Sequence, residues 1–217
     1  MHFVRIMQKS RIVTLAGALF VALGLLVFPM AWAVARSPVR SVLELRRERT
    51  VIQKWDLSCG AAALATILNY QYGDPVSEKE IAQGLISRQE YLADPSLVQK
   101  QQGFSLLDLK DYVVARGYEG DGYGNLTLED LIELAPVIVP VSVRGYAHFV
   151  VFRGVMGDRV LVADPAYGNR TMSRRRFEDA WIVYPETGRV AFAVTRGDGT
   201  APLNRLAPRA RDFVIMK

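Results

Sequence analysis

Residues 53–68 read QKWDLSCGAAALATIL and indicate a helix that begins at a cysteine. Small residues follow Cys59, and Leu64 and Leu68 then recur at helical spacing, which predicts a helix over residues 59–70. The first N–H groups of a helix lack intrahelical partners and carry partial positive charge, so they favour a thiol in its nucleophilic thiolate form. A buried structural cysteine on an alanine-rich helix face is the alternative interpretation.

Cysteine and histidine are scarce in this chain. Cys59 is the single cysteine, and His148 is the single histidine apart from His2. An intrachain disulfide is therefore impossible, and a zinc site with the usual cysteine and histidine ligands is nearly excluded, so we expect no metal and no cofactor. A nucleophilic Cys–His pair is either Cys59 with His148 or absent.

The N-terminal segment predicts export. Arg5, Lys9 and Arg11 form a positively charged beginning. An uncharged run rich in Leu, Val and Ala follows up to residue 35 and ends in two Ala-x-Ala sites, the order of a secretory signal peptide. Residues 12–35 would also be long enough to cross a hydrocarbon core of about 30 Å, so membrane anchoring through them is the alternative. Either form places the rest of the chain outside the cytoplasm.

The charge balance excludes one class of partner. The formal net charge is +5, but 24 basic and 22 acidic residues remain once the three basic residues of the export segment are set aside. This balance gives no reason to expect binding to nucleic acid. With 50% hydrophobic and 23% charged residues, the composition is that of a folded globular domain.

Helical patterns come first in the chain and strand patterns follow. After the helix that Cys59 begins, further helices are predicted over residues 77–86, 106–116 and 127–135. Strands are predicted over residues 137–143, 147–155, 159–163, 181–184 and 189–195, the last two as a hairpin. This order predicts an α+β fold with N-terminal helices packed on a C-terminal antiparallel sheet.

The same sequence patterns predict the domain organisation. We expect a signal peptide or membrane anchor over residues 1–35, one folded domain over 36–195 and a C-terminal tail over 196–217. The polar stretch 88–103 is expected to form a long loop that flanks a cleft.

His148 lies in an apolar strand, and Asp164 ends the next strand along the chain. If residues 156–158 form a three-residue loop, Val150 pairs with Asp164, and the carboxylate lies diagonal to His148 on one face of the sheet. A carboxylate there would fix the imidazole tautomer and stabilise the imidazolium. Both residues also have structural interpretations, because most strand histidines are structural and Asp-Pro often ends a strand.

Gln53 is the fourth candidate. It lies six residues before Cys59, and its side-chain amide could donate a hydrogen bond to the oxyanion of a tetrahedral intermediate beside the Cys59 N–H. Taken alone, Gln53 is equally well interpreted as an exposed loop glutamine.

Together these segments resemble the peptidase C39 family, the bacteriocin-processing cysteine peptidases that are often fused to peptide-secreting ABC transporters. The resemblance covers about residues 50–181 and rests on Gln-x5-Cys-Gly-Ala-Ala-Ala-Leu-Ala-Thr at 53–66, Ser-Leu-Leu-Asp-Leu at 105–109, Tyr-Ala-His-Phe-Val-Val at 146–151 and Val-Ala-Asp-Pro-Ala at 162–166. The chain departs from the family pattern at Ser58, where Asp is common, and at Ala61, where Pro is common.

The resemblance implies a papain-like fold with four functional side chains. By that pattern Cys59 is the nucleophile and His148 the general base. Asp164 orients the histidine, and Gln53 donates to the oxyanion. The implied activity is that of a cysteine endopeptidase, a hydrolase that processes exported peptide or protein substrates through an acyl-enzyme.

The chain is more similar to stand-alone exported members of the family than to the transporter-fused ones. Some of those members accompany functional-amyloid secretion in Gram-negative bacteria, which implies a periplasmic location and a secreted amyloid or leader peptide as substrate. Two alternatives remain open at this point. One is a non-catalytic peptide-binding or chaperone module of a secretion system, and the other is a cell-wall peptidase or amidase.

Overall fold

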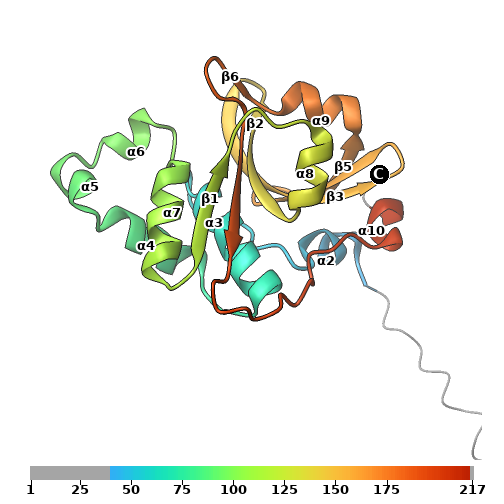
Figure 1. Cartoon of the computed structure of the whole chain (residues 1–217), viewed down its shortest axis with the longest axis horizontal. Helices are drawn as coiled ribbons and strands as arrows, with labels where there is room; N and C mark the ends of the chain where they lie inside the picture. Colours follow the sequence, from blue (N-terminus) through green and yellow to red (C-terminus); the bar gives the residue numbers. More distant parts are fainter. Residues whose placement is uncertain (1–39, 216–217) are drawn as a thin grey trace, which may run out of the picture. The chain divides into compact units, whose positions relative to one another are not determined.

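A computed structural model of the chain describes residues 40–215 (Figure 1). The predicted export segment over residues 1–35 lies outside this range. Within the described range, no helix is both long enough and apolar enough to cross a bilayer. The α+β order predicted from the sequence is confirmed, with helices packed on an antiparallel sheet.

A six-stranded antiparallel sheet forms the centre of the domain, in the strand order β1-β8-β2-β3-β4-β5. Its strands are β1 (Glu119–Tyr123), β2 (Val137–Val143), β3 (Tyr146–Met156), β4 (Arg159–Asp164), β5 (Gly168–Ser173) and β8 (Ala191–Thr195). A separate pair consists of β6 (Val183–Tyr184) and β7 (Gly188–Arg189).

The helices fall before, between and after these strands. They are α2 (Val42–Arg47), α3 (Cys59–Ile67), α4 (Glu78–Ile86), α5 (Gln89–Ala93), α6 (Leu97–Lys100), α7 (Leu106–Ala115), α8 (Leu128–Leu134), α9 (Arg174–Ala180) and α10 (Ala210–Ile215). The predicted helix over residues 59–70 is confirmed, although its last part is a π-helical turn, Leu68–Tyr72.

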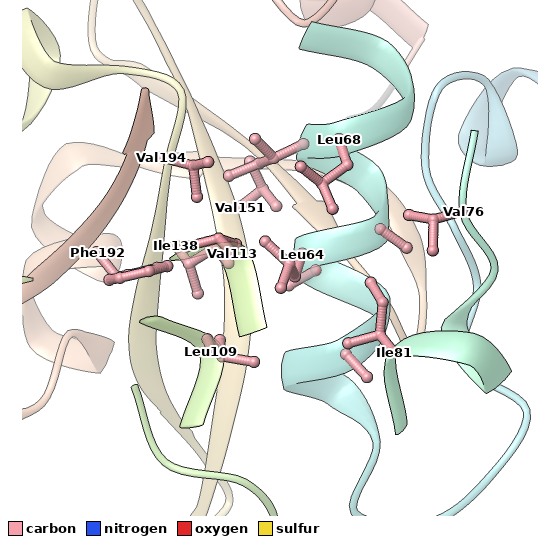
Figure 2. Close-up of a cluster of buried hydrophobic side chains, with 14 of the residues drawn as sticks. Leu64, Leu68, Val76, Ile81, Leu109, Val113, Ile138, Val151, Phe192 and Val194 are labelled. Atoms are coloured by element: carbon pink, nitrogen blue, oxygen red, sulfur yellow. The ribbon is translucent and has the colours of Figure 1, made fainter. Parts of the chain in front are cut away.

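Two hydrophobic cores lie on opposite faces of the sheet, because successive side chains of a strand point to opposite faces. On one face Leu64 of α3 and Leu68 of the π-helical turn after it pack toward Val151, Ile138 and Phe192, as Figure 2 shows. Every residue of α3 is buried, and its small alanines allow the helix to lie close to the sheet.

The second core lies under α8 and α9. Phe152 of β3 packs there with Phe177 of α9 and with Trp181, the residue that ends α9. Neighbouring residues of β3 therefore contribute to different cores, Val150 to the second and Val151 to the first.

The structure corrects the sequence prediction at both edges of the sheet. β1 and β5 are the outermost strands, and neither was predicted, because edge strands carry polar and glycine residues rather than alternating apolar ones. The predicted hairpin of residues 181–184 with 189–195 is confirmed only where Val183 pairs with Arg189, whereas residues 191–195 form β8, which pairs with β1 and β2. Residues 88–103 were expected to be a loop but contain the short helices α5 and α6, held by the buried Tyr91.

The predicted pairing in the hairpin of β3 and β4 was wrong near the loop and correct at the far end. Met156 pairs with Arg159, so the loop has two residues, not the three predicted. A bulge at Arg153 takes up the difference, because Phe152 pairs with Val162 while the next pair is Gly154 with Leu161. At the other end Val151 pairs with Ala163. Continuing this pairing by one residue gives the predicted neighbours Val150 and Asp164.

The bulge also receives the C-terminal segment. Arg153 is buried, and its guanidinium donates to the carbonyl of Leu206 at 2.8 Å and to Asn169 Oδ1 at 2.6 Å. Asp212 of α10 lies 3.4 Å from the same guanidinium. Because Leu206 and Phe213 are themselves buried, residues beyond 195 contribute to the packing of the domain.

Candidate active site

Cys59 is the first residue of α3. The first helical hydrogen bond runs from the Ala62 N–H to the Ser58 carbonyl at 3.0 Å, so the N–H groups before Ala62 precede the helical ladder. Ser58 is the N-cap residue, but its side chain accepts no bond from this first turn. The positive end of α3 is therefore free of a side-chain cap where the thiol lies, which favours a negatively charged sulfur or oxygen.

Gly60 brings α3 close to β3. A Cβ atom at this position would lie 3.3 Å from Cδ2 of Phe149, which is tighter than an ordinary carbon–carbon contact. Phe149 follows His148 on β3. The missing side chain of Gly60 thus allows the helix end that carries Cys59 to lie against the strand that carries His148.

The structure brings Cys59, His148 and Asp164 together. His148 Nε2 lies 2.9 Å from Asp164 Oδ1, and the interaction of the imidazole with the Cys59 thiol raises the pKa of His148. Cys59 and His148 line one cavity of about 240 Å³. The imidazole is therefore held between a thiol and a carboxylate, as a general base in nucleophilic catalysis requires.

The electrostatics of the group favour a charged histidine. Burial alone would lower the pKa of His148, but its hydrogen bonds to Asp164 and Cys59 outweigh burial and raise the pKa to about 9. Burial would likewise raise the pKa of Asp164, yet the hydrogen bond and charge of His148 keep that pKa below its ordinary value. The carboxylate is therefore the charged partner of an imidazolium.

Further contacts fix the Asp164 carboxylate. Its Oδ1 accepts the Ala166 N–H at 2.9 Å, and its Oδ2 lies 3.1 Å from Arg170 Nη1. The Gln53 N–H donates to the carbonyl of Pro165 at 2.9 Å. This last bond ties the segment before Cys59 to the turn after Asp164, and so joins the two halves of the site.

The side chain of Gln53 is not placed as a ready oxyanion donor. Its Nε2 donates to the carbonyl of Trp55 at 3.2 Å, and its Oε1 is buried without a partner in the described part of the chain. Gln53 is also absent from the described residues that line the cavity of Cys59 and His148. The structure thus places the Gln53 backbone beside the site and turns its amide toward its own loop.

Glu78 is a residue that the sequence analysis did not single out. It is buried, and its carboxylate accepts the Lys54 N–H at 2.9 Å and contacts the Ser58 hydroxyl. Ser58 Oγ also donates to the carbonyl of Trp55 at 2.7 Å. These bonds hold the turn before Cys59, in which Leu57 adopts a left-handed φ of 67°. In the sequence Glu78 is an ordinary acidic residue of a helix first turn, so no signal marked it.

The cavity beside Cys59 has mainly apolar walls. Its apolar lining residues are Phe104, Leu106, Pro140, Ala147, Phe149 and Tyr184. Gln101 and Gln102, from the stretch expected to flank a cleft, also line it. A second cavity of about 380 Å³ is also lined by Phe104 and includes Trp55, Ile86 and Val98. Concave apolar surfaces of this kind suit the side chains of a peptide.

The chain is similar to known proteins over most of the described residues. The model of the peptidase C39 family matches residues 47–185. Over 153 residues the chain is 42% identical to the probable functional amyloid protease FapD of Pseudomonas aeruginosa, covering 69% of this chain and 65% of that protein. The FapD protein of Pseudomonas fluorescens is 41% identical over 176 residues, which is 80% of this chain and 72% of that protein.

Solved structures show the same fold. The peptidase domain of Streptococcus ComA matches with a TM-score of 0.53 and 22% identity, over 68% of this chain and 97% of that domain. A double-glycine-motif protease from an AMS/PCAT transporter, solved with its leader peptide, also has a TM-score of 0.53 and 22% identity, over 68% of this chain and 90% of that one. The α+β fold is therefore papain-like. With its thiol, imidazole and carboxylate in place, the chain belongs to the peptidase C39 family.

Proposed function

We propose that this chain is a cysteine endopeptidase in which Cys59, His148 and Asp164 form the catalytic group. The observation that supports the proposal most strongly is the position of His148, which bonds Asp164 at 2.9 Å, lines one cavity with Cys59 and has its pKa raised by both residues. A buried structural histidine would have no need of both partners, and a structural cysteine would have no need of an uncapped helix end.

The reaction follows from these positions. The Cys59 thiolate attacks the carbonyl carbon of the scissile peptide bond, and a C–S bond forms. The His148 imidazolium gives its proton to the leaving amine as the C–N bond breaks. Water then attacks the acyl-enzyme, His148 takes a proton from it, and the thiolate leaves with the C–S bonding electrons. Asp164 stabilises the imidazolium through each step.

The oxyanion is stabilised by the first turn of α3. The Cys59 N–H lies at the positive end of the helix, where developing negative charge is favoured. Gln53 completes the site when its amide exchanges the 3.2 Å bond to the Trp55 carbonyl for one to the oxyanion. A distance of 3.2 Å lies at the long end of the usual N–H···O range.

We propose further that the chain acts outside the cytoplasm, in the periplasm, on an exported peptide or protein. The signal-like residues 1–35 support export, either with cleavage or with anchoring through residues 12–35. Two relatives that are named functional amyloid proteases support a component of amyloid secretion as the substrate. The apolar walls of the two cavities beside Cys59 suit an extended peptide.

The decisive experiment compares exported proteins from cells that carry the native chain, Cys59→Ala or His148→Ala. New protein N-termini present with the native chain and absent with both variants would identify the substrate and its cleavage motif. Thermal unfolding of Cys59→Ala serves as the control for folding. Identical termini in all three strains contradict the proposal. If cells with Cys59→Ala also behave as cells with the native chain do, the chain is a peptide-binding module. If the products that depend on Cys59 are fragments of muropeptides, the chain is a cell-wall enzyme.

A further inference from the structure

A larger cavity, of about 570 Å³, opens beside Asp164. It is separate from the cavity that Cys59 and His148 line. The buried residues Val150, Val162 and Phe177 contribute apolar surface to it. Because Asp164 lines this cavity and also bonds His148, a ligand held here would lie one side chain away from the imidazole.

Four arginines from four different segments surround this cavity. They are Arg46 of α2, Arg144 of the turn between β2 and β3, Arg170 of β5 and Arg176 of α9. Among the described residues that line the cavity, Asp164 is the one carboxylate, and its two oxygens already contact His148 and Arg170. The lining therefore carries a clear excess of positive charge.

Three of these arginines have no partner within the described part of the chain. Arg46, Arg144 and Arg176 form no side-chain hydrogen bond and no ion pair there. Elsewhere in the domain, arginines such as Arg88 and Arg116 bond carboxylates at 2.5 and 2.6 Å. Unpaired guanidinium groups are common on a protein surface, but here three of them converge on one concave surface with an apolar floor.

Guanidinium groups recognise carboxylates with two parallel hydrogen bonds, and the apolar floor accepts an aliphatic or aromatic side chain. A short peptide segment with carboxylates beside apolar residues satisfies both features, and a cavity of this volume holds a ligand of that size. Basic residues also bind anionic lipid headgroups, and the experiment below tests that ligand too.

We infer that this arginine-lined cavity binds an acidic, partly apolar segment of the peptide substrate. The inference rests on the proposed function and adds a substrate class to it. The segment would lie against β5 and α9 while the scissile bond lies at Cys59, so the substrate would be held at two separate places on the domain. Binding would weaken as salt concentration rises, because the charges at the rim are exposed.

The sequence supplies closely matched control variants. Arg46 and Arg47 are neighbours on α2, and Arg175 and Arg176 are neighbours on α9. All four of these arginines are exposed, but in each pair only one lines the cavity. The double variant Arg46→Ala with Arg176→Ala therefore removes the same charge from the same helices as Arg47→Ala with Arg175→Ala.

A third variant tests the turn. Arg144 adopts a left-handed φ of 54°, which asparagine also accepts, so Arg144→Asn removes the charge without straining the backbone. Thermal unfolding of each variant checks that it folds.

The experiment measures binding by the full chain carrying Cys59→Ala, so that no turnover is needed. The probe is the fluorescein-labelled peptide Glu-Leu-Glu-Leu-Glu-Leu, and the comparison peptide has Gln in place of each Glu. We expect the acidic peptide to bind more tightly, and the Arg46/Arg176 double variant to lose about tenfold in affinity for it, as two partly exposed ion pairs predict. Arg144→Asn should lose several-fold, and the Arg47/Arg175 control should lose almost nothing.

Three results would overturn the inference. The two double variants could weaken binding equally, the acidic peptide could show no advantage over its glutamine version, or only vesicles of phosphatidylglycerol could bind in a way that depends on Arg46 and Arg176. The last result would assign the surface to the membrane. Because the measurement uses a chain without its thiol, binding of the acidic peptide can succeed or fail independently of peptidase activity.

Discussion

The first turn of α3 differs from the first turns of α2, α4, α7 and α8. Those four helices begin with complete capping boxes, in which a serine or threonine and an acidic residue three positions later satisfy each other's backbone N–H groups. In α3 the N-cap residue is also a serine, Ser58, but its hydroxyl turns away to Trp55 and Glu78. The same residue type thus caps a helix in one place and leaves it open in another.

The difference shows how the domain divides stability from chemistry. A capped helix end stabilises the fold and offers nothing to a substrate. An uncapped end is less stable but keeps its N–H groups available for a thiolate or an oxyanion. Cys59 lies at the open end, and the charged His148 and Asp164 lie beside it.

The largest expected effect concerns the charge of His148. Its pKa is raised to about 9 in the folded chain, against about 6.5 for a free histidine. Because folding raises this pKa, the imidazolium stabilises the fold fully at pH values below the pKa of the unfolded chain, about 6.5. The stabilisation, about 3 kcal/mol in all, is lost as the pH rises through the pKa of the folded chain, about 9. Urea unfolding of the native chain and of His148→Ala, across this window, should show a steeper loss for the native chain. Parallel curves would contradict the charged pair.

The next effect concerns Asp164. Asp164→Asn removes the negative charge that stabilises the imidazolium, so the pKa of His148 should fall by about 1 to 2 units. NMR of the imidazole measures this directly, because the chain has only one other histidine, His2, and His148→Ala assigns the signals. A titration midpoint that stays in place would mean that the carboxylate holds the ring without tuning it.

A smaller effect concerns the turn before Cys59. Glu78→Ala leaves the Lys54 N–H without its acceptor and removes one partner of the Ser58 hydroxyl, at a cost of about 1 to 2 kcal/mol in unfolding free energy. Alkylation of Cys59 by iodoacetamide should also slow, because the turn that positions the thiol loosens. Glu80→Ala is the control on the same helix, since Glu80 only caps α4. It should lower stability and leave alkylation unchanged. Equal alkylation rates in both variants would exclude a positioning role for Glu78.

The smallest effect tests the two kinds of helix end against each other. Thr127→Ala removes the cap of α8 and should cost about 1 kcal/mol of stability without changing the alkylation rate of Cys59. Ser58→Ala removes no cap, so it should lower the unfolding free energy less than Thr127→Ala does. It should slow the alkylation of Cys59, which Thr127→Ala leaves unchanged. Urea unfolding gives the unfolding free energy of each variant, and iodoacetamide gives its alkylation rate. If the two variants change the unfolding free energy and the alkylation rate in the same proportion, the capped and uncapped helix ends do not differ in role.

Much of the fold could be predicted from periodicity and capping residues. The helices that contain Leu64, Ile81, Leu109 and Leu131 were predicted, because each has apolar residues at helical spacing and each of the last three begins with a capping box. The edge strands β1 and β5 could not be predicted, because their residues are polar and acquire strand structure only by pairing with their neighbours. The bulge at Arg153 is likewise invisible in the sequence, since it is specified by its partners Leu206 and Asn169.

The candidate site was predictable in part. Cys59 and His148 followed from counting, and Asp164 from the hairpin register. Glu78 could not be found, because nothing in its local sequence shows that it turns inward. The arginine-lined cavity could not be found either, because Arg46 and Arg144 lie far in the sequence from each other and from Arg170 and Arg176, and the four meet only in the folded domain.

The most direct test measures the alkylation rate of Cys59 against pH, in the native chain and in His148→Ala. A nucleophilic sulfur beside an imidazolium predicts fast alkylation of the native chain at neutral pH. His148→Ala should be at least about tenfold slower there. If the native chain and the variant follow the same curve, Cys59 and His148 do not form the proposed pair.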